Sequence, residues 1–181
     1  VVDLPFGSYE VSDDQALTNS IRVMKETGAD AVKLEGAKLS QIRALVSSGI
    51  PVMGHVGFTP QSVNTLAGYK VQGRSEQDAA RILQECKDIE AAGAFAVVLE
   101  MIPAELAQEI SQKLAIPTIG IGAGADCDGQ ILVWQDFAGL GTRSPKFAKQ
   151  YLNLRQDLSA AATAFRNEVV AGEFPAPEQQ F

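Results

Sequence analysis

Ala31-Val32-Lys33-Leu34-Glu35 and Pro51-Val52-Met53-Gly54-His55-Val56 are two short β-rich runs in the first third of the chain. The apolar residues between them recur at helical spacing until Gly49, namely Leu39, Ile42, Leu45 and Val46. A strand, a helix and a second strand in this order are typical of a βαβ unit, whose two strands lie parallel in one sheet. This stretch therefore predicts an α/β fold.

The same alternation continues on both sides of this unit. Further strands are expected at residues 1–4, 95–100, 117–121 and 130–134. Further helices are expected after Ser12, after Ser75 and after Pro103, and one or two amphipathic helices between residues 147 and 169. Strands that are each followed by helical sequence fit either an open doubly wound sheet or an incomplete (β/α) barrel.

The length of the chain favours the barrel. The chain has 181 residues, whereas a (β/α)8 TIM barrel typically takes about 250. Two βα units of roughly 35 residues each would make up the difference, and the chain opens inside an apolar run without an initiator Met. We therefore expect a (β/α)8 barrel that lacks roughly the first two βα units. Residues 1–172 are expected to form this single domain and residues 173–181 a C-terminal tail.

Composition narrows the possible partners and compartment. With a net charge of −7, the chain lacks the excess of basic residues that binding to nucleic acids or anionic membranes requires. No apolar run approaches the roughly 20 residues that span a bilayer, and no secretory signal opens the chain, so a cytoplasmic location is expected. Cys86 and Cys127 have neither a disulfide framework nor zinc-ligand spacing and are predicted to be free thiols.

Three acidic residues each end an apolar run: Asp3, Glu35 and Glu100. In parallel α/β folds the active site lies at the carboxyl ends of the strands, where these side chains would converge. Converging carboxylates suit Mg²⁺, which takes one or two carboxylates and fills its other positions with water and substrate oxygens. The structural alternative is that each acid caps the next helix or pairs with a surface lysine.

Lys33 and His55 are the other candidates at these strand ends. Lys33 lies two residues before Glu35, so both side chains point to the same face of a strand. A lysine buried on that face needs a partner, either Glu35 or an anionic substrate, and a simple internal ion pair is equally compatible with the pattern. His55 is the only histidine, and a lone histidine is more often structural than catalytic.

Blocks of sequence distributed along the chain carry a family resemblance. They are Asp3-Leu4-Pro5-Phe6, Val32-Lys33-Leu34-Glu35-Gly36, Gly54-His55-Val56-Gly57-Phe58-Thr59-Pro60-Gln61-Ser62, Gly68-Tyr69-Lys70-Val71-Gln72-Gly73-Arg74, Leu99-Glu100-Met101-Ile102-Pro103, Ile116-Pro117-Thr118-Ile119-Gly120-Ile121-Gly122-Ala123-Gly124 and Asp128-Gly129-Gln130-Ile131-Leu132-Val133. Together, and in this order, they resemble the 3-methyl-2-oxobutanoate (ketopantoate) hydroxymethyltransferase family.

The resemblance implies an enzyme and its reaction. It implies a (β/α)8 barrel in a cytoplasmic homo-oligomer, usually a decamer, with Mg²⁺ and with 5,10-methylenetetrahydrofolate as co-substrate. The enzyme would transfer a hydroxymethyl group to 3-methyl-2-oxobutanoate through a Mg-stabilised enolate, giving 2-dehydropantoate (ketopantoate) for pantothenate and coenzyme A synthesis. Its partners would thus be a small 2-oxo acid and a folate.

The resemblance also implies roles for individual residues. Asp3 and Glu35 match the family's metal ligands, Asp3, Lys33 and His55 match positions at the substrate, and Glu100 matches the proton acceptor. The folate contacts are not assigned. An Asp-Ser pair that the family carries on an earlier strand has no counterpart before Asp3. Two alternatives are a folate-independent Mg-dependent 2-oxo acid enzyme of the phosphoenolpyruvate mutase or isocitrate lyase kind, and an inactive truncated chain.

Overall fold

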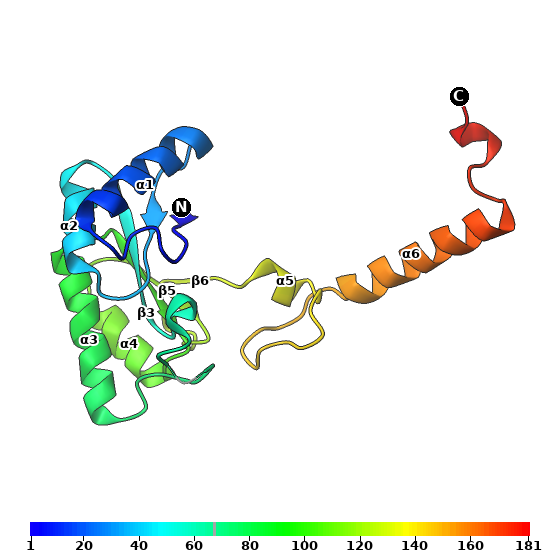
Figure 1. Cartoon of the computed structure of the whole chain (residues 1–181). Coiled ribbons are helices and arrows are strands. Elements are labelled where there is room, and N and C mark those ends of the chain that lie inside the picture. The colour runs from blue at the N-terminus through cyan, green and yellow to red at the C-terminus, as the bar shows by residue number, and fades with distance from the viewer. Residues whose placement is uncertain (67) are drawn as a thin grey trace. The chain divides into compact units, whose positions relative to one another are not determined.

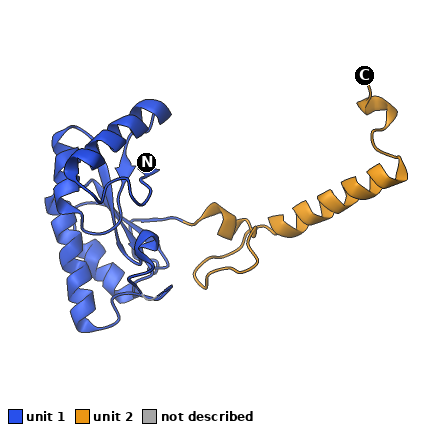
Figure 2. Ribbon diagram, in the orientation of Figure 1, with its two compact units in different colours: residues 1–131 blue, residues 132–181 orange. Residues whose placement is uncertain are grey.

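A computed structural model describes residues 1–66 and 68–181 of the chain. The chain divides into two compact units, residues 1–131 and residues 132–181, which are coloured separately in Figure 2. The sequence places a domain boundary after residue 172, whereas the boundary between the compact units follows Ile131. The assignment of residues 1–172 to a single barrel domain stays a prediction.

The first unit is built on one parallel sheet. Its strands are β1 (Val2–Asp3), β2 (Val32–Lys33), β3 (Val52–Gly57), β4 (Ala96–Glu100), β5 (Thr118–Ile121) and β6 (Gly129–Gln130). All neighbours pair in parallel, and the strands follow one another in sequence order across the sheet. A doubly wound sheet would reverse its strand order at a switch point, so this six-stranded sheet is a half-barrel.

Four helices follow the strands in the first unit. They are α1 (Asp13–Thr27), α2 (Leu39–Ser47), α3 (Glu76–Ala91) and α4 (Ala104–Lys113), and a short 3₁₀ helix, η1 (Pro60–Ser62), follows β3. The predicted caps are confirmed: the Oγ of Ser12 accepts from the N–H of Gln15, and that of Ser75 accepts from the N–H of Asp78. The helices contact one another in chain order and lie along one side of the sheet (Figure 1).

The core lies between the sheet and these helices. Its fully buried members include Leu34, Val52, Val97 and Leu99 from the strands and strand ends, and Ile42, Leu45, Ile82, Ile89 and Ile110 from the helices. Both cysteines are free, as expected. Burial raises the pKa of the Cys86 thiol to about 12, so Cys86 acts as a small apolar core residue.

The prediction of a strand at residues 130–134 is largely wrong. Strand β6 ends at Gln130, and Trp134 begins a short helix, α5 (Trp134–Phe137). The carbonyl of Val133 accepts hydrogen bonds from the N–H groups of Asp136 and Phe137, which commits it to a helical turn rather than to a strand ladder.

The second unit contains α5, then α6 (Leu154–Ala171) and a 3₁₀ helix, η2 (Pro177–Gln179). The helical pattern predicted from residue 147 becomes a helix only at Leu154. The N–H of Tyr151 donates to the carbonyl of Phe137, at 2.7 Å, and that of Leu154 to the carbonyl of Ala138, at 2.9 Å. These hydrogen bonds hold residues 151–154 against the end of α5, so α6 does not begin before Leu154. None of the helices within the described ranges is long and apolar enough to cross a membrane.

Candidate active site

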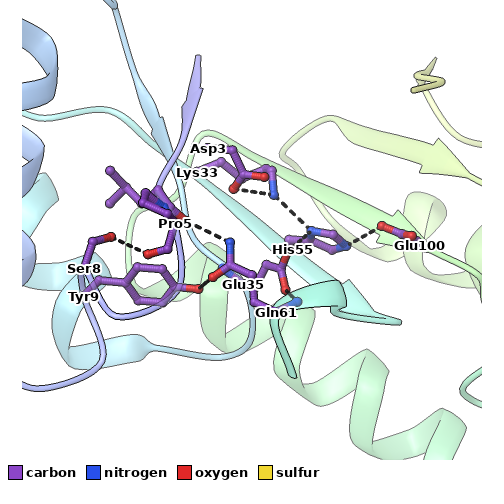
Figure 3. Close-up of polar contacts among 10 residues, drawn as sticks. Asp3, Pro5, Ser8, Tyr9, Lys33, Glu35, His55, Gln61 and Glu100 are labelled. Atoms are coloured by element: carbon purple, nitrogen blue, oxygen red, sulfur yellow. Dashed lines mark hydrogen bonds and ion pairs between the residues drawn. The ribbon is translucent and has the colours of Figure 1, made fainter. Parts of the chain in front are cut away.

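The five predicted site residues meet at the carboxyl ends of four neighbouring strands (Figure 3). Asp3, Lys33 and Glu100 are the last residues of β1, β2 and β4, and Glu35 follows β2 by two positions. His55 lies within β3, in register with Val98 of β4. The parallel register therefore gathers side chains that are far apart in the sequence.

A continuous polar chain links four of these residues across the sheet. The Nζ of Lys33 lies 2.8 Å from the Oδ1 of Asp3 and 3.1 Å from the Nδ1 of His55. The Nε2 of His55 lies 3.2 Å from the Oε2 of Glu100. The internal partner of Lys33 is thus Asp3, and not Glu35 as the spacing along β2 had allowed.

These contacts assign the tautomer of His55. A lysine ammonium has only protons to offer, so the Nδ1 of His55 must accept from Lys33, and the remaining proton of a neutral imidazole is then on Nε2. That N–H faces Glu100 at ion-pair distance, although its alignment does not meet hydrogen-bond geometry, and it has no other partner within the described part of the chain. His55 is 3 % exposed and therefore lies between a cation and a carboxylate, away from bulk water.

Glu35 is the most buried carboxylate of the site, at 5 % exposure. Its Oε2 accepts from the backbone N–H of Gln61, at 2.9 Å. Its Oε1 lies 3.9 Å from the Nδ1 of His55, which accepts a hydrogen bond from Lys33 and therefore carries no proton to donate to Glu35. Burial raises the pKa of Glu35, only partly offset by the hydrogen bond from Gln61. The hydrogen bonds and positive charges of the described residues therefore only partly offset the cost of burying the negative charge of Glu35.

Two residues of the site escaped the sequence analysis as functional candidates: Tyr9 and Gln61. The hydroxyl of Tyr9 accepts from the N–H of Glu35, at 3.2 Å, and donates to the Oε1 of Gln61, at 2.7 Å. The Nε2 of Gln61 donates to the carbonyl of Leu4, at 2.8 Å. The two side chains thus connect the end of β1, beside Asp3, to Glu35. Gln61 lies inside a family-like block, but nothing in its local pattern marks this role.

Backbone strain adjoins Glu100. Met101, the next residue, has a φ of 48°, and it alone among the described non-glycine residues has a positive φ. Its N–H donates to the carbonyl of Ile121 and its carbonyl accepts from the N–H of Gln72. A left-handed non-glycine residue costs on the order of 1–3 kcal/mol and persists only where its surroundings hold it. The turn after Glu100 is therefore fixed by its neighbours on both sides.

A family model described as ketopantoate hydroxymethyltransferase matches residues 1–177, almost the whole chain. The chain belongs to the ketopantoate hydroxymethyltransferase family. The resemblance carried by the sequence blocks is confirmed by this match.

Individual members of the ketopantoate hydroxymethyltransferase family are closely similar to this chain in sequence. The 3-methyl-2-oxobutanoate hydroxymethyltransferase of Thermobifida fusca is 57 % identical over 183 residues, covering 100 % of this chain and 65 % of that protein. That of Leifsonia xyli subsp. xyli is 56 % identical over 184 residues, with 66 % of its length covered. The chain thus spans slightly under two thirds of the length of these relatives.

Solved structures show the fold alone. A putative phosphonomutase from Burkholderia cenocepacia superposes with a TM-score of 0.53 at 15 % identity, covering 92 % of this chain and 70 % of that one. At this identity the likeness supports the half-barrel architecture and carries no statement about the reaction of this ketopantoate hydroxymethyltransferase family member.

This member of the ketopantoate hydroxymethyltransferase family has carboxylate oxygens of a kind that suits Mg²⁺. Glu35 is a buried carboxylate short of positive charge, and the carboxylate of Asp3, 52 % exposed, is reachable from solvent. Residues 1–66 and 68–181 contain no group of three or more His, Cys, Asp or Glu side chains placed so that together they could hold a metal ion. Two carboxylates, with water and substrate oxygens completing the sphere, are typical of Mg²⁺ rather than of zinc. The donor set fits.

Proposed function

We propose that this chain takes part in transferring a hydroxymethyl group from 5,10-methylenetetrahydrofolate to 3-methyl-2-oxobutanoate, giving 2-dehydropantoate for pantothenate synthesis. The observation that carries the proposal is the polar chain Asp3, Lys33, His55 and Glu100 at one end of the sheet, beside Glu35. The proposal includes a (β/α)8 barrel as the complete fold, with residues 1–172 in one domain and 173–181 as a tail. It also includes a cytoplasmic homo-oligomer.

Binding of the 2-oxo acid is assigned to Asp3, Lys33 and His55. The substrate is an anion, and Lys33 is the cation of the site, with its side chain 15 % exposed. Asp3 and Glu35 would hold Mg²⁺, which when bound supplies positive charge to the carboxylate and keto oxygens of a 2-oxo acid. Lys33 adds positive charge where negative charge develops on the substrate, in a site shielded from water.

Proton removal is assigned to Glu100. The C3 proton of the 2-oxo acid must leave before a new carbon–carbon bond can form there, and a positioned carboxylate can accept it. The Nε2 of His55 lies 3.2 Å from one oxygen of Glu100, and the second oxygen of this carboxylate is assigned to the substrate. C3 then forms a carbon–carbon bond to the methylene carbon of the folate. The two carbon–nitrogen bonds of that methylene carbon break, water supplies the hydroxyl oxygen, and tetrahydrofolate leaves with the protons on its nitrogens. Orientation of the reactants lowers the activation barrier of the reaction by on the order of 7 kcal/mol.

Exchange of the C3 proton tests this assignment without folate. In deuterated water with Mg²⁺, the protein is expected to exchange the C3 proton of 3-methyl-2-oxobutanoate. Glu100→Gln is expected to slow exchange by about 100-fold or more, because the amide cannot accept the proton. Proton NMR of the substrate gives the rate. Exchange at the original rate in Glu100→Gln would remove Glu100 from the mechanism.

Matched variants separate this role from a general effect of losing an acid. Glu105→Gln removes an exposed carboxylate in the first turn of α4 and should leave the exchange rate unchanged. Asp3→Ala should shift the Mg²⁺ titration of the exchange rate to higher concentration, because it removes a proposed ligand. An identical Mg²⁺ titration in Asp3→Ala would take Asp3 out of the metal site.

A further inference from the structure

Two aromatic rings in tilted contact lie beyond the end of β3, outside the polar chain of the site. Phe58 is fully buried, and Tyr69 leans against it with ring centroids 4.9 Å apart and an interplanar angle of 37°. Tyr69 nevertheless stays 76 % exposed. An aromatic ring that is supported on one side and open to solvent on the other offers a flat surface for a second ring system.

Backbone hydrogen bonds tether this pair to the residue assigned as the proton acceptor. The N–H of Phe58 donates to the carbonyl of Glu100, at 2.8 Å, and the N–H of Gln72 donates to the carbonyl of Met101, at 2.9 Å. Tyr69 is three residues from Gln72, a span of at most about 11 Å. The ring of Tyr69, through its contact with Phe58, therefore belongs to the same part of the fold as the backbone of Glu100.

The charge of this segment differs from that of the rest of the protein. Residues 58–74 contain no Asp or Glu and two cations, Lys70 and Arg74, in a chain whose net charge is −7. Both cations are exposed, and neither forms a salt bridge to any other described residue. The segment 58–74 thus combines an open aromatic face with positive charge that no acid of the described chain neutralises.

We propose that Tyr69, Lys70 and Arg74 form the subsite for the folate co-substrate. A folate carries a flat pterin ring at one end and glutamate carboxylates at the other, so it matches both features of the segment, whereas a small 2-oxo acid has no ring to stack. Tyr69 stacks on the pterin, and Lys70 and Arg74 attract the carboxylates. The inference rests on the proposed function for its choice of ligand.

Binding measurements test the subsite independently of turnover. Isothermal titration with tetrahydrofolate is expected to give a Kd about tenfold weaker for Tyr69→Ala than for the original chain, the loss of one stacking contact. The double variant Lys70→Gln with Arg74→Gln should weaken tetrahydrofolate binding but leave the binding of 6-hydroxymethylpterin, which has no glutamate, unchanged. Tyr151→Ala, which removes an exposed tyrosine of the second unit, is the matched control and should bind like the original chain.

Comparing folate binding with C3 exchange separates this inference from the proposed function. Tyr69→Ala is expected to lose folate affinity while its folate-independent C3 exchange stays within about twofold of the original rate. Equal tetrahydrofolate affinity in Tyr69→Ala, absence of binding in the original chain, or parallel loss of exchange and binding would each overturn the subsite. Tyr69-dependent binding without any C3 exchange would keep the subsite and overturn the proposed reaction.

Discussion

The hydroxyl of Tyr9 has both of its hydrogen-bonding roles filled inside the site. It accepts from the N–H of Glu35 and donates to the side chain of Gln61. Burial raises the pKa of Tyr9 to about 12, so the hydroxyl keeps its proton and remains a donor throughout the neutral range. Tyr9 therefore positions Glu35 and Gln61.

Tyr9→Phe should destabilise the protein by about 1–3 kcal/mol. The ring would still pack, but the buried N–H of Glu35 would lose its only partner within the described residues and Gln61 would lose a donor. The free energy of unfolding in urea measures the effect. Tyr151→Phe, at a position 64 % exposed, is the control and should change stability by less than about 0.5 kcal/mol. Equal stability of Tyr9→Phe and the original chain would contradict the positioning role.

Single residues of the site were predictable where the signal is local. An acid at the end of an apolar run marks a strand end, and this rule placed Asp3, Glu35 and Glu100 correctly at one edge of the sheet. Tyr9 and Gln61 were missed because their partners lie 26 and 52 positions away in the chain. Only the folded structure brings these groups together.

The contact between β3 and β4 depends on a glycine at the end of β3. Gly57 has a φ of +91°, and a Cβ there would lie 2.2 Å from the carbonyl oxygen of Glu100. Gly49, after α2, has a similar φ of +81° but open space around a Cβ. An alanine at either position would have to adopt the same unfavourable left-handed backbone conformation. Only at Gly57 would its Cβ also clash with the carbonyl oxygen of Glu100.

Gly57→Ala is therefore expected to cost more than Gly49→Ala. The shared backbone strain is about 1–2 kcal/mol, and displacing a neighbouring backbone carbonyl adds about 1–3 kcal/mol to Gly57→Ala alone. Urea denaturation of both variants gives the difference directly. The same displacement should move Glu100 and slow C3 exchange in Gly57→Ala only. Equal stability losses in the two variants would show that β3 can withdraw from β4 at little cost.

Whole elements were predicted well where apolar runs are short and bounded. The run at residues 95–100 became β4, Ala96–Glu100, and the serine caps located α1 and α3. The predicted element boundaries were wrong where backbone contacts between distant parts of the chain determine where an element starts. The start of α6 at Leu154 depends on hydrogen bonds to Phe137 and Ala138, which no helical periodicity reports.

The molecule as a whole concentrates its core in one unit. Every residue of the buried apolar cluster lies between Leu4 and Ala123, whereas α6 exposes Leu158, Phe165 and Val169. Periodicity alone could not reveal this division, because an amphipathic pattern looks the same whether or not its apolar face is covered. The sequence therefore predicted α6 correctly as a helix and left its surroundings open.

Limited proteolysis of the whole chain should report this division. Trypsin is expected to cut early after Arg143, Lys146 or Lys149 in the second unit and after Lys70 or Arg74 in the first, because all five are exposed and lie outside helices and strands. Arg81 and Lys87 lie in α3, which packs on the sheet, and should resist until the first unit unfolds. Mass spectrometry of early digests would then show fragments that end at these five residues and none that end at Arg81 or Lys87. Early cuts at Arg81 or Lys87 would mean that α3 unfolds as readily as the segment that contains Arg143, Lys146 and Lys149. The core would then not hold α3 on the sheet.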